Sequence, residues 1–182
     1  MPTDSTPEGI GELHDQLTSA VGCLAVEFGR LELDVSELAS SALGRADVAT
    51  RDAINAVLSF RQKLDLIGAL APARLTDPAQ LTEVQACVQR LQRFEDERNG
   101  LLHAFWTFLR DEGESAPGRF VRSKVRAHRK KGLTDHTKAV DFSDIRELVN
   151  EIRKYRRIFG QQGSLYYSAD LLYSASRGKR ET

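Results

Sequence analysis

One long apolar stripe limits what this chain can fold into more than any other feature. Between Gly9 and Leu43, apolar residues recur at steps of three and four, the repeat of one face of an α-helix. Gly44 supplies a helix stop. A helix of this length must cover its stripe along a partner, so we expect a helical bundle or a dimer. The stripe consists of Leu13, Leu17, Val21, Leu24, Phe28, Leu31, Val35, Leu38 and Ala42.

Three further helices are predicted from the same periodicity. After a loop and cap over 47–52, a second helix begins at Ala53 and ends at Pro72, which cannot continue it. A capping residue before proline, in Thr76-Asp77-Pro78, opens a third helix that we expect to reach Leu109. Ser143 caps a fourth helix, which ends near Phe159.

Between the third and fourth helices the apolar period changes from helical to alternating. One alternating run covers 119–126 and a second covers 134–142, with Gly132 in the turn between them. The pattern predicts a β-hairpin at about 117–142. Because an isolated hairpin is marginally stable in water, we expect it to pack on the helices. The predicted fold is all-α: an antiparallel bundle of four to five helices with a small basic hairpin.

Length and composition favour a soluble protein of one domain, or of one domain with a small appendage. The chain has 182 residues, and its 41% hydrophobic content is enough for a real core. We expect a flexible N-terminus over 1–8, the helical domain over 9–162 and a C-terminal tail over 163–182, in which two apolar stretches are able to dock. Without a long apolar run or a signal-peptide pattern, we expect a cytoplasmic protein with no membrane partner.

The two cysteines and the four histidines show no metal-ligand spacing. Cys23 and Cys87 lie among apolar helical residues, so we expect two buried thiols. We therefore expect no metal and no cofactor.

The net charge of zero conceals an uneven distribution. Residues 1–48 hold nine acids against two arginines, whereas residues 113–182 hold sixteen lysines and arginines against eight acids. This pattern favours self-association or a polyanionic partner, and an ordinary solvated surface is the alternative.

Polar residues interrupt the apolar face of the predicted third helix. On a helical wheel, Glu95 and Arg98 fall in the middle of the buried stripe, and a break in binary patterning often marks a functional place. Asn99 and His103 lie at the edge of the stripe, four residues apart, and Asp96 lies beside His103. On the opposite side, Gly100 either relaxes the helix or admits a close neighbour. The stripe consists of Val84, Val88, Leu91, Leu102, Phe105 and Leu109.

The segment Arg98-Asn99-Gly100-Leu101-Leu102-His103 resembles the signature of the HEPN superfamily: an arginine, a polar residue and a histidine after four intervening positions. The flanking Phe94-Glu95-Asp96-Glu97 and Ala104-Phe105-Trp106 are also similar to that family, as is the stretch from Leu58 to Ile67. The resemblance covers about 51–110, and the hairpin is an elaboration outside it.

This resemblance implies a helical bundle that forms a homodimer, with two motifs facing one cleft. It further implies either a metal-independent endoribonuclease, often a toxin or a phage-defence component, or a module that only binds RNA or nucleotides. An antitoxin or a nucleotidyltransferase is the partner implied for such a protein.

The residues suit cleavage of RNA without a metal. Histidine is the side chain whose ordinary pKa lies near neutrality, so His103 is the candidate base for the 2′-hydroxyl. Arg98 offers a planar fork of donors to the phosphate oxygens. Asn99 would position His103 or the phosphate, and Glu95 and Asp96 would orient these groups from behind.

The predicted hairpin is strongly basic. Residues 119–131 hold seven lysines and arginines and no acid, and alternation places Arg122, Lys124 and Arg126 on one strand face. Such a face is suited to bind the phosphate backbone of RNA. Alternatively, the same cations protect an edge strand from aggregation.

Three interpretations remain open from sequence: a HEPN-type ribonuclease, an RNA-binding or nucleotide-binding module, and a structural adaptor in which Glu95 and Arg98 form a buried registry pair. The sequence contains no Gly-rich phosphate loop, no G-x-S-x-G elbow and no HExxH motif.

Overall fold

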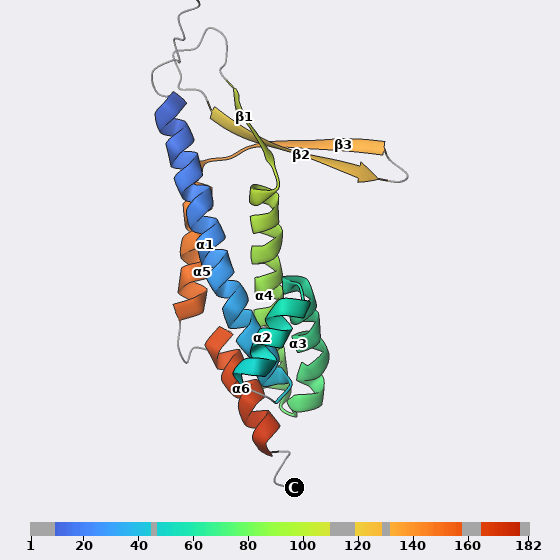
Figure 1. The fold of residues 1–182 in the computed structure, drawn as a ribbon. Coiled ribbons are helices and arrows are strands. Elements are labelled where there is room, and N and C mark those ends of the chain that lie inside the picture. Colours follow the sequence, from blue (N-terminus) through green and yellow to red (C-terminus); the bar gives the residue numbers. More distant parts are fainter. Residues whose placement is uncertain (1–9, 45–46, 110–118, 129–131, 158–164, 179–182) are drawn as a thin grey trace, which may run out of the picture. The chain divides into compact units, whose positions relative to one another are not determined.

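A computed structural model describes residues 10–44, 47–109, 119–128, 132–157 and 165–178 (Figure 1). The described chain is mainly helical with a small sheet, which confirms the predicted mainly α-helical class. Its elements in chain order are α1 (Ile10–Ala42), α2 (Val48–Val57), α3 (Phe60–Arg74), α4 (Pro78–Leu102), β1 (Phe105–Leu109), β2 (Arg119–His128), β3 (Gly132–Ala139), α5 (Phe142–Arg157) and α6 (Leu165–Gly178). No helix of these described segments is long and apolar enough to cross a membrane.

The chain divides into two compact units. The first, here called the hairpin unit, consists of Met1–Ala25 and Glu97–Val149. The second, the helical unit, consists of Val26–Asp96 and Asn150–Thr182. The unit boundaries fall inside α1, α4 and α5, and each unit is described by itself.

The first predicted helix is confirmed almost to the residue. It spans Ile10–Ala42, and its stripe is buried at Leu17, Leu24, Phe28, Leu31, Val35, Leu38 and Ala42. Gly44 ends the helical segment as predicted, since it has a φ of 73°, which an L side chain rarely adopts.

The predicted second helix is in fact two helices, α2 and α3. Asp47 caps α2 directly, with its Oδ1 accepting from the backbone of Thr50 at 2.8 Å, so the predicted loop over 47–52 is wrong. Leu58 is extended and Ser59 starts α3 with a capping box to Gln62. Pro72 lies inside the last turn of α3, which ends at Arg74, so the predicted stop at Pro72 is two residues early.

The core of the helical unit contains aromatic pairs between segments far apart in sequence. The rings of Phe28 and Phe60 are 4.8 Å apart between centroids, and those of Phe94 and Tyr155 are 5.7 Å apart. The tail forms α6, in which Leu172 is fully buried. The second of the two apolar stretches therefore docks through Leu172. The side chains of Leu165 and Tyr166, in the first stretch, lie outside the described residues.

The two cysteines differ from each other. Cys87 is buried as predicted, but Cys23 is exposed. The prediction for Cys23 is wrong because this residue lies away from the stripe of α1, next to exposed Gly22.

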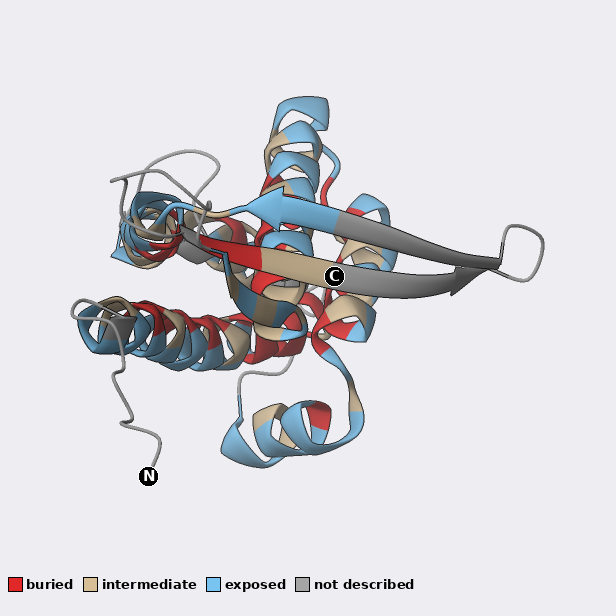
Figure 2. Cartoon of the chain, turned by 90° about the horizontal axis from the view of Figure 1, so that it is seen from above, coloured by how far each residue is buried: buried red, intermediate tan, exposed pale blue. Residues whose placement is uncertain are grey.

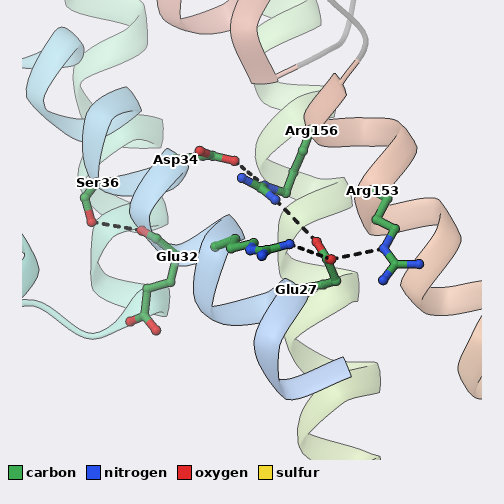
Figure 3. A network of polar contacts seen from close by, with 7 residues as sticks. Glu27, Glu32, Asp34, Ser36, Arg153 and Arg156 are labelled. Atoms are coloured by element: carbon green, nitrogen blue, oxygen red, sulfur yellow. Dashed lines mark hydrogen bonds and ion pairs between the residues drawn. The ribbon is translucent and has the colours of Figure 1, made fainter. Parts of the chain in front are cut away.

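A buried carboxylate organises the charged residues of the helical unit (Figure 3). Glu27 on α1 is 4% exposed, and its oxygens receive Arg30 and Arg153 at 3.0 Å each and Arg156 at 3.4 Å. Arg156 also pairs with Asp34. Burial tends to raise the pKa of Glu27, but the three arginines outweigh it and hold this pKa below the ordinary value of 4.5.

The hairpin unit contains a three-stranded antiparallel sheet in the order β1-β2-β3. The predicted hairpin is confirmed as β2 and β3, joined in register from Val121↔Ala139 to His128↔Gly132. Phe120 packs edge-on against Phe108 at 5.4 Å and lies 6.0 Å from Phe142. Along β2, burial decreases from Phe120 and Val121 to the half-buried residues that follow, as its colour change in Figure 2 shows.

The third predicted helix ends earlier than expected. It begins at Pro78 under an Asp77 cap, as predicted, but α4 stops at Leu102 instead of Leu109. The remaining segment forms β1, in which Phe105 is 74% exposed and Leu109 is 43% exposed. The expectation that both are buried is wrong, because a strand alternates its side chains between two faces.

Candidate functional site

The polar cluster lies at the C-terminal end of α4. Arg98 and Asn99 are half-buried, and Arg98 Nη1 donates a hydrogen bond to Asn99 Oδ1 at 2.8 Å. This bond fixes one edge of the guanidinium relative to the helix. A guanidinium is a planar fork of donors that suits a phosphate or a carboxylate.

His103 is the first residue after α4, and its side chain is exposed. The predicted position inside a helix is therefore wrong by one residue. The helical spacing is nevertheless kept, because the backbone N–H of His103 donates to the carbonyl of Asn99 at 3.4 Å. The chain beyond is held by Trp106, whose Nε1 donates to the carbonyl of Leu101 at 3.2 Å. An imidazole open to solvent thus follows Asn99 by one turn.

Gly100 admits a close neighbour, which was one of its two predicted roles. A Cβ built on Gly100 would lie 2.7 Å from Arg122 Nη1 and 3.7 Å from its Cζ. No real Cβ tolerates the first distance, so the guanidinium occupies space that any other residue would fill. Through this gap, Arg122 on β2 reaches the helical turn that carries Arg98 and Asn99.

Arg122 has a second cation beside it. In the register of the sheet, it lies directly opposite Trp106 on β1 and opposite Lys138 on β3, so all three share one face. Lys138 is exposed and Arg122 is half-buried. Within the part of the chain that the structure describes, neither cation has a carboxylate partner.

The acids predicted to stand behind the cluster form ion pairs with an arginine on α3. Arg61 on α3 pairs with Glu95 through Nε and with Asp96 through Nη2, each at 2.8 Å. Glu95 is largely buried, whereas Asp96 is mostly exposed. Both acids belong to the helical unit, where they tie α3 to α4. Their predicted role in orienting the motif stays a prediction.

The other two predicted RNA contacts, Lys124 and Arg126, lie further along β2. The backbone of β2 continues through Lys124↔His136 and Arg126↔Thr134. The side chains of Lys124 and Arg126 lie outside the described residues. Among the described side chains of β2, Arg122 is the predicted RNA contact that reaches the motif.

Two pKa shifts elsewhere belong to structure. The pKa of Asp141 is lowered, chiefly by the hydrogen bond it accepts from the backbone of Ser143 at the start of α5. Burial raises the pKa of the Cys87 thiol and of the Tyr155 hydroxyl, which lie together in the core. Among the described residues, no group of three histidine, cysteine or acidic side chains is arranged to hold a metal ion.

Comparison with known proteins adds nothing to these residues. No protein-family model matches the chain, and no curated protein and no solved structure matches it. The HEPN resemblance therefore rests on the sequence alone: the motif, its flanking residues and the stretch from Leu58 to Ile67.

Sequence reasoning did not single out Lys138 or Trp106 as neighbours of Arg122. Both follow from strand register, and β1 itself was absent from the prediction. The aromatic and β-branched run Phe105-Trp106-Thr107-Phe108 was the available signal for that strand.

Proposed function

We propose that this protein is a HEPN-like, metal-independent endoribonuclease in which His103 is the general base and Arg98 stabilises the phosphate. Asn99 positions Arg98 through the hydrogen bond between their side chains. The observation that carries the proposal is the combination of an exposed histidine one turn beyond a bonded Arg98–Asn99 pair, with the Arg122 guanidinium over the same turn. A base and a cation that stabilises the phosphate are the groups that this cleavage needs.

In the proposed reaction, the 2′-oxygen of the RNA forms a bond to phosphorus, and the bond from phosphorus to the 5′-oxygen breaks. His103 accepts the 2′-hydroxyl proton, and the departing 5′-oxygen takes a proton from water. Arg98 donates to the nonbridging oxygens, whose negative charge grows as the new bond forms. The products are a 2′,3′-cyclic phosphate end and a 5′-hydroxyl end.

The resemblance extends the proposal to assembly. We propose a homodimer in which two copies of the motif face one cleft, as in the family that the motif resembles. An antitoxin or a nucleotidyltransferase would then be the partner that restrains the activity. Light scattering on the purified chain measures whether it forms this dimer.

The proposal is tested by incubating purified protein with single-stranded and structured RNA in EDTA and identifying the new ends. We expect cyclic phosphate ends from the wild type and a loss of about a thousandfold in rate for His103→Ala. Arg98→Lys keeps the charge but loses the fork, so it should lose rate as well.

His14→Ala is the matched control, because His14 is an exposed histidine on α1 with no proposed role. Cleavage that survives in both His103→Ala and Arg98→Gln would contradict the proposal.

A second candidate is a module that binds RNA without cleaving it. The two neighbouring cations Arg122 and Lys138 favour this candidate, since they can bind the phosphates of RNA without a catalytic base. Salt-dependent binding of RNA that is never shortened would select this candidate. The third interpretation, a structural adaptor, predicts neither binding nor cleavage.

A further inference from the structure

The usual explanation for a lysine or arginine in a β-sheet, protection of an edge strand, does not apply to Arg122. Lysine and arginine protect edge strands from pairing with other chains. However, β2 is the central strand, hydrogen-bonded to β1 on one side and to β3 on the other. Edge protection accounts for Lys138 on β3 at most, and Arg122 needs another explanation.

The placement of Arg122 opposite Lys138 also costs stability. Like charges directly opposite each other across two strands repel, and neither cation has a carboxylate partner within the described segments. A phosphate group between them would convert this repulsion into two charge-assisted hydrogen bonds.

The helix next to this pair is shaped to let the guanidinium in. Gly100 leaves the space that Arg122 Nη1 occupies, at a helical position where glycine is otherwise unfavourable. A glycine that weakens the helix but makes room for one arginine side chain is expected where that arginine has a function.

An aromatic side chain completes the face. Trp106 lies directly opposite Arg122 and is half-buried, and its indole N–H is bound to the carbonyl of Leu101. A fixed indole beside cations is the combination by which proteins hold single strands: cations bind the backbone and a base stacks on the ring. Duplex RNA keeps its bases stacked inside and offers none to Trp106.

We propose, resting on the ribonuclease function above, that Arg122, Lys138 and Trp106 form a binding site for single-stranded RNA next to the reacting phosphate. Arg122 and Lys138 bind a phosphate of the strand, and Trp106 stacks on an adjoining base. Gly100 is the positioning residue that keeps the Arg122 guanidinium over α4. The site selects single strands and holds the substrate against the Arg98 and His103 end of the helix.

Binding is measured apart from cleavage with a short single-stranded 2′-O-methylated oligonucleotide, which lacks the attacking hydroxyl. Trp106 is the only tryptophan in the chain, so its fluorescence reports on this site alone. We expect the oligonucleotide to quench it and a duplex of the same sequence to bind at least tenfold more weakly. Equal affinity for the duplex would overturn the assignment to single strands.

Matched variants test the named residues. Arg122→Gln and Lys138→Gln should each weaken binding about tenfold and lower the slope of log K against log salt by about 0.7. Arg93→Gln and Lys154→Gln remove an exposed cation from the helical unit and should leave binding nearly unchanged. An equal effect of Arg122→Gln and Arg93→Gln would overturn the site.

Gly100→Ala is the sharpest variant because it changes no charge. Its Cβ would lie 2.7 Å from Arg122 Nη1, so the flexible end of the Arg122 side chain has to shift from its place over α4. Binding should therefore weaken, by less than in Arg122→Gln, while the melting temperature stays equal or rises. Unchanged binding by Gly100→Ala would contradict the positioning role.

The two proposals fail separately. Cleavage that depends on His103 with binding that ignores Arg122 would refute the single-strand site and leave the ribonuclease. Oligonucleotide binding that depends on Arg122 without any cleavage would refute the ribonuclease and leave the site.

Discussion

The helical unit and the hairpin unit treat their charged residues in opposite ways. In the helical unit, Glu27 is buried and three arginines surround it, and Arg61 joins two further acids on α4. In the hairpin unit, Arg122 and Lys138 lie side by side, and no described carboxylate pairs with either of them.

This difference separates charges whose ion pairs stabilise the fold from charges to which we assign RNA binding in the proposal above. A buried ion that loses its partner is expensive, so the helical unit depends on its pairs. Like charges that face each other across two strands contribute no stability, which is why we propose a binding role for Arg122 and Lys138. Substitutions should therefore affect stability in one unit and RNA binding in the other.

The largest stability effect is expected for Glu27→Gln. The change leaves Arg153 and Arg156 with no carboxylate at that position, and it should lower the free energy of unfolding by about 3 kcal/mol. Urea unfolding measures the loss, and Glu147→Gln, on the exposed face of α5, is the control that should change little. A loss below about 1 kcal/mol would contradict the claim that the helical unit depends on the ion pairs of Glu27.

Lys63 is the next most sensitive charge. Its side chain is 0% exposed, and its Nζ donates to Asn55 Oδ1 at 2.8 Å and lies 3.5 Å from a Glu32 oxygen. Lys63→Met keeps the length of the side chain but removes these interactions, so we expect a loss of about 2 kcal/mol. The same change at exposed Lys154 should have almost no effect, and equal losses at both positions would contradict the prediction.

Acid should weaken the helical unit through Glu27. Because the pKa of Glu27 is lower in the folded chain than its ordinary 4.5, the unfolded chain takes up this proton first as the pH falls. The stabilisation is therefore complete above the ordinary value and is lost as the pH drops through the folded value. The stability gap between wild type and Glu27→Gln should narrow from about pH 6 to about pH 3. A gap that stays constant over this range would contradict the assigned shift.

The smallest stability effects are expected in the hairpin unit. Arg122→Gln and Lys138→Gln remove one of two repelling charges, so each should change the free energy of unfolding by less than about 0.5 kcal/mol. Thermal unfolding of these variants beside Glu27→Gln gives the comparison directly. A loss as large as that of Glu27→Gln would make Arg122 a structural residue.

Most of the fold follows from periodicity, and its errors have definite causes. The stripe of α1 is long and regular, so both its ends were predictable. Leu58 and Ser59 interrupt the helix, but the apolar residues keep their helical spacing from α2 into α3. Periodicity in the sequence therefore gave no sign of the break. The strand β1 was missed because Phe105 and Leu109 also fit the helical spacing of α4.

The site was predictable only as far as it lies on one helix. The order of Arg98, Asn99 and His103 along the chain placed them within about one and a half helical turns, and the structure keeps the one-turn spacing from Asn99 to His103. The approach of Arg122 to Gly100 depends on how the sheet meets α4, which no local pattern encodes. Two of the three arginine partners of Glu27, Arg153 and Arg156, come from α5, more than one hundred residues away in sequence.

One measurement tests the ribonuclease assignment most directly. A single RNA is prepared with and without a 2′-deoxy nucleotide at the linkage that the wild type cleaves, and cleavage is followed in EDTA. The account predicts that the wild type cuts the all-ribose linkage but not the deoxy linkage, and that His103→Ala cuts neither. Continued cleavage at the deoxy linkage, or full activity of His103→Ala, would contradict it.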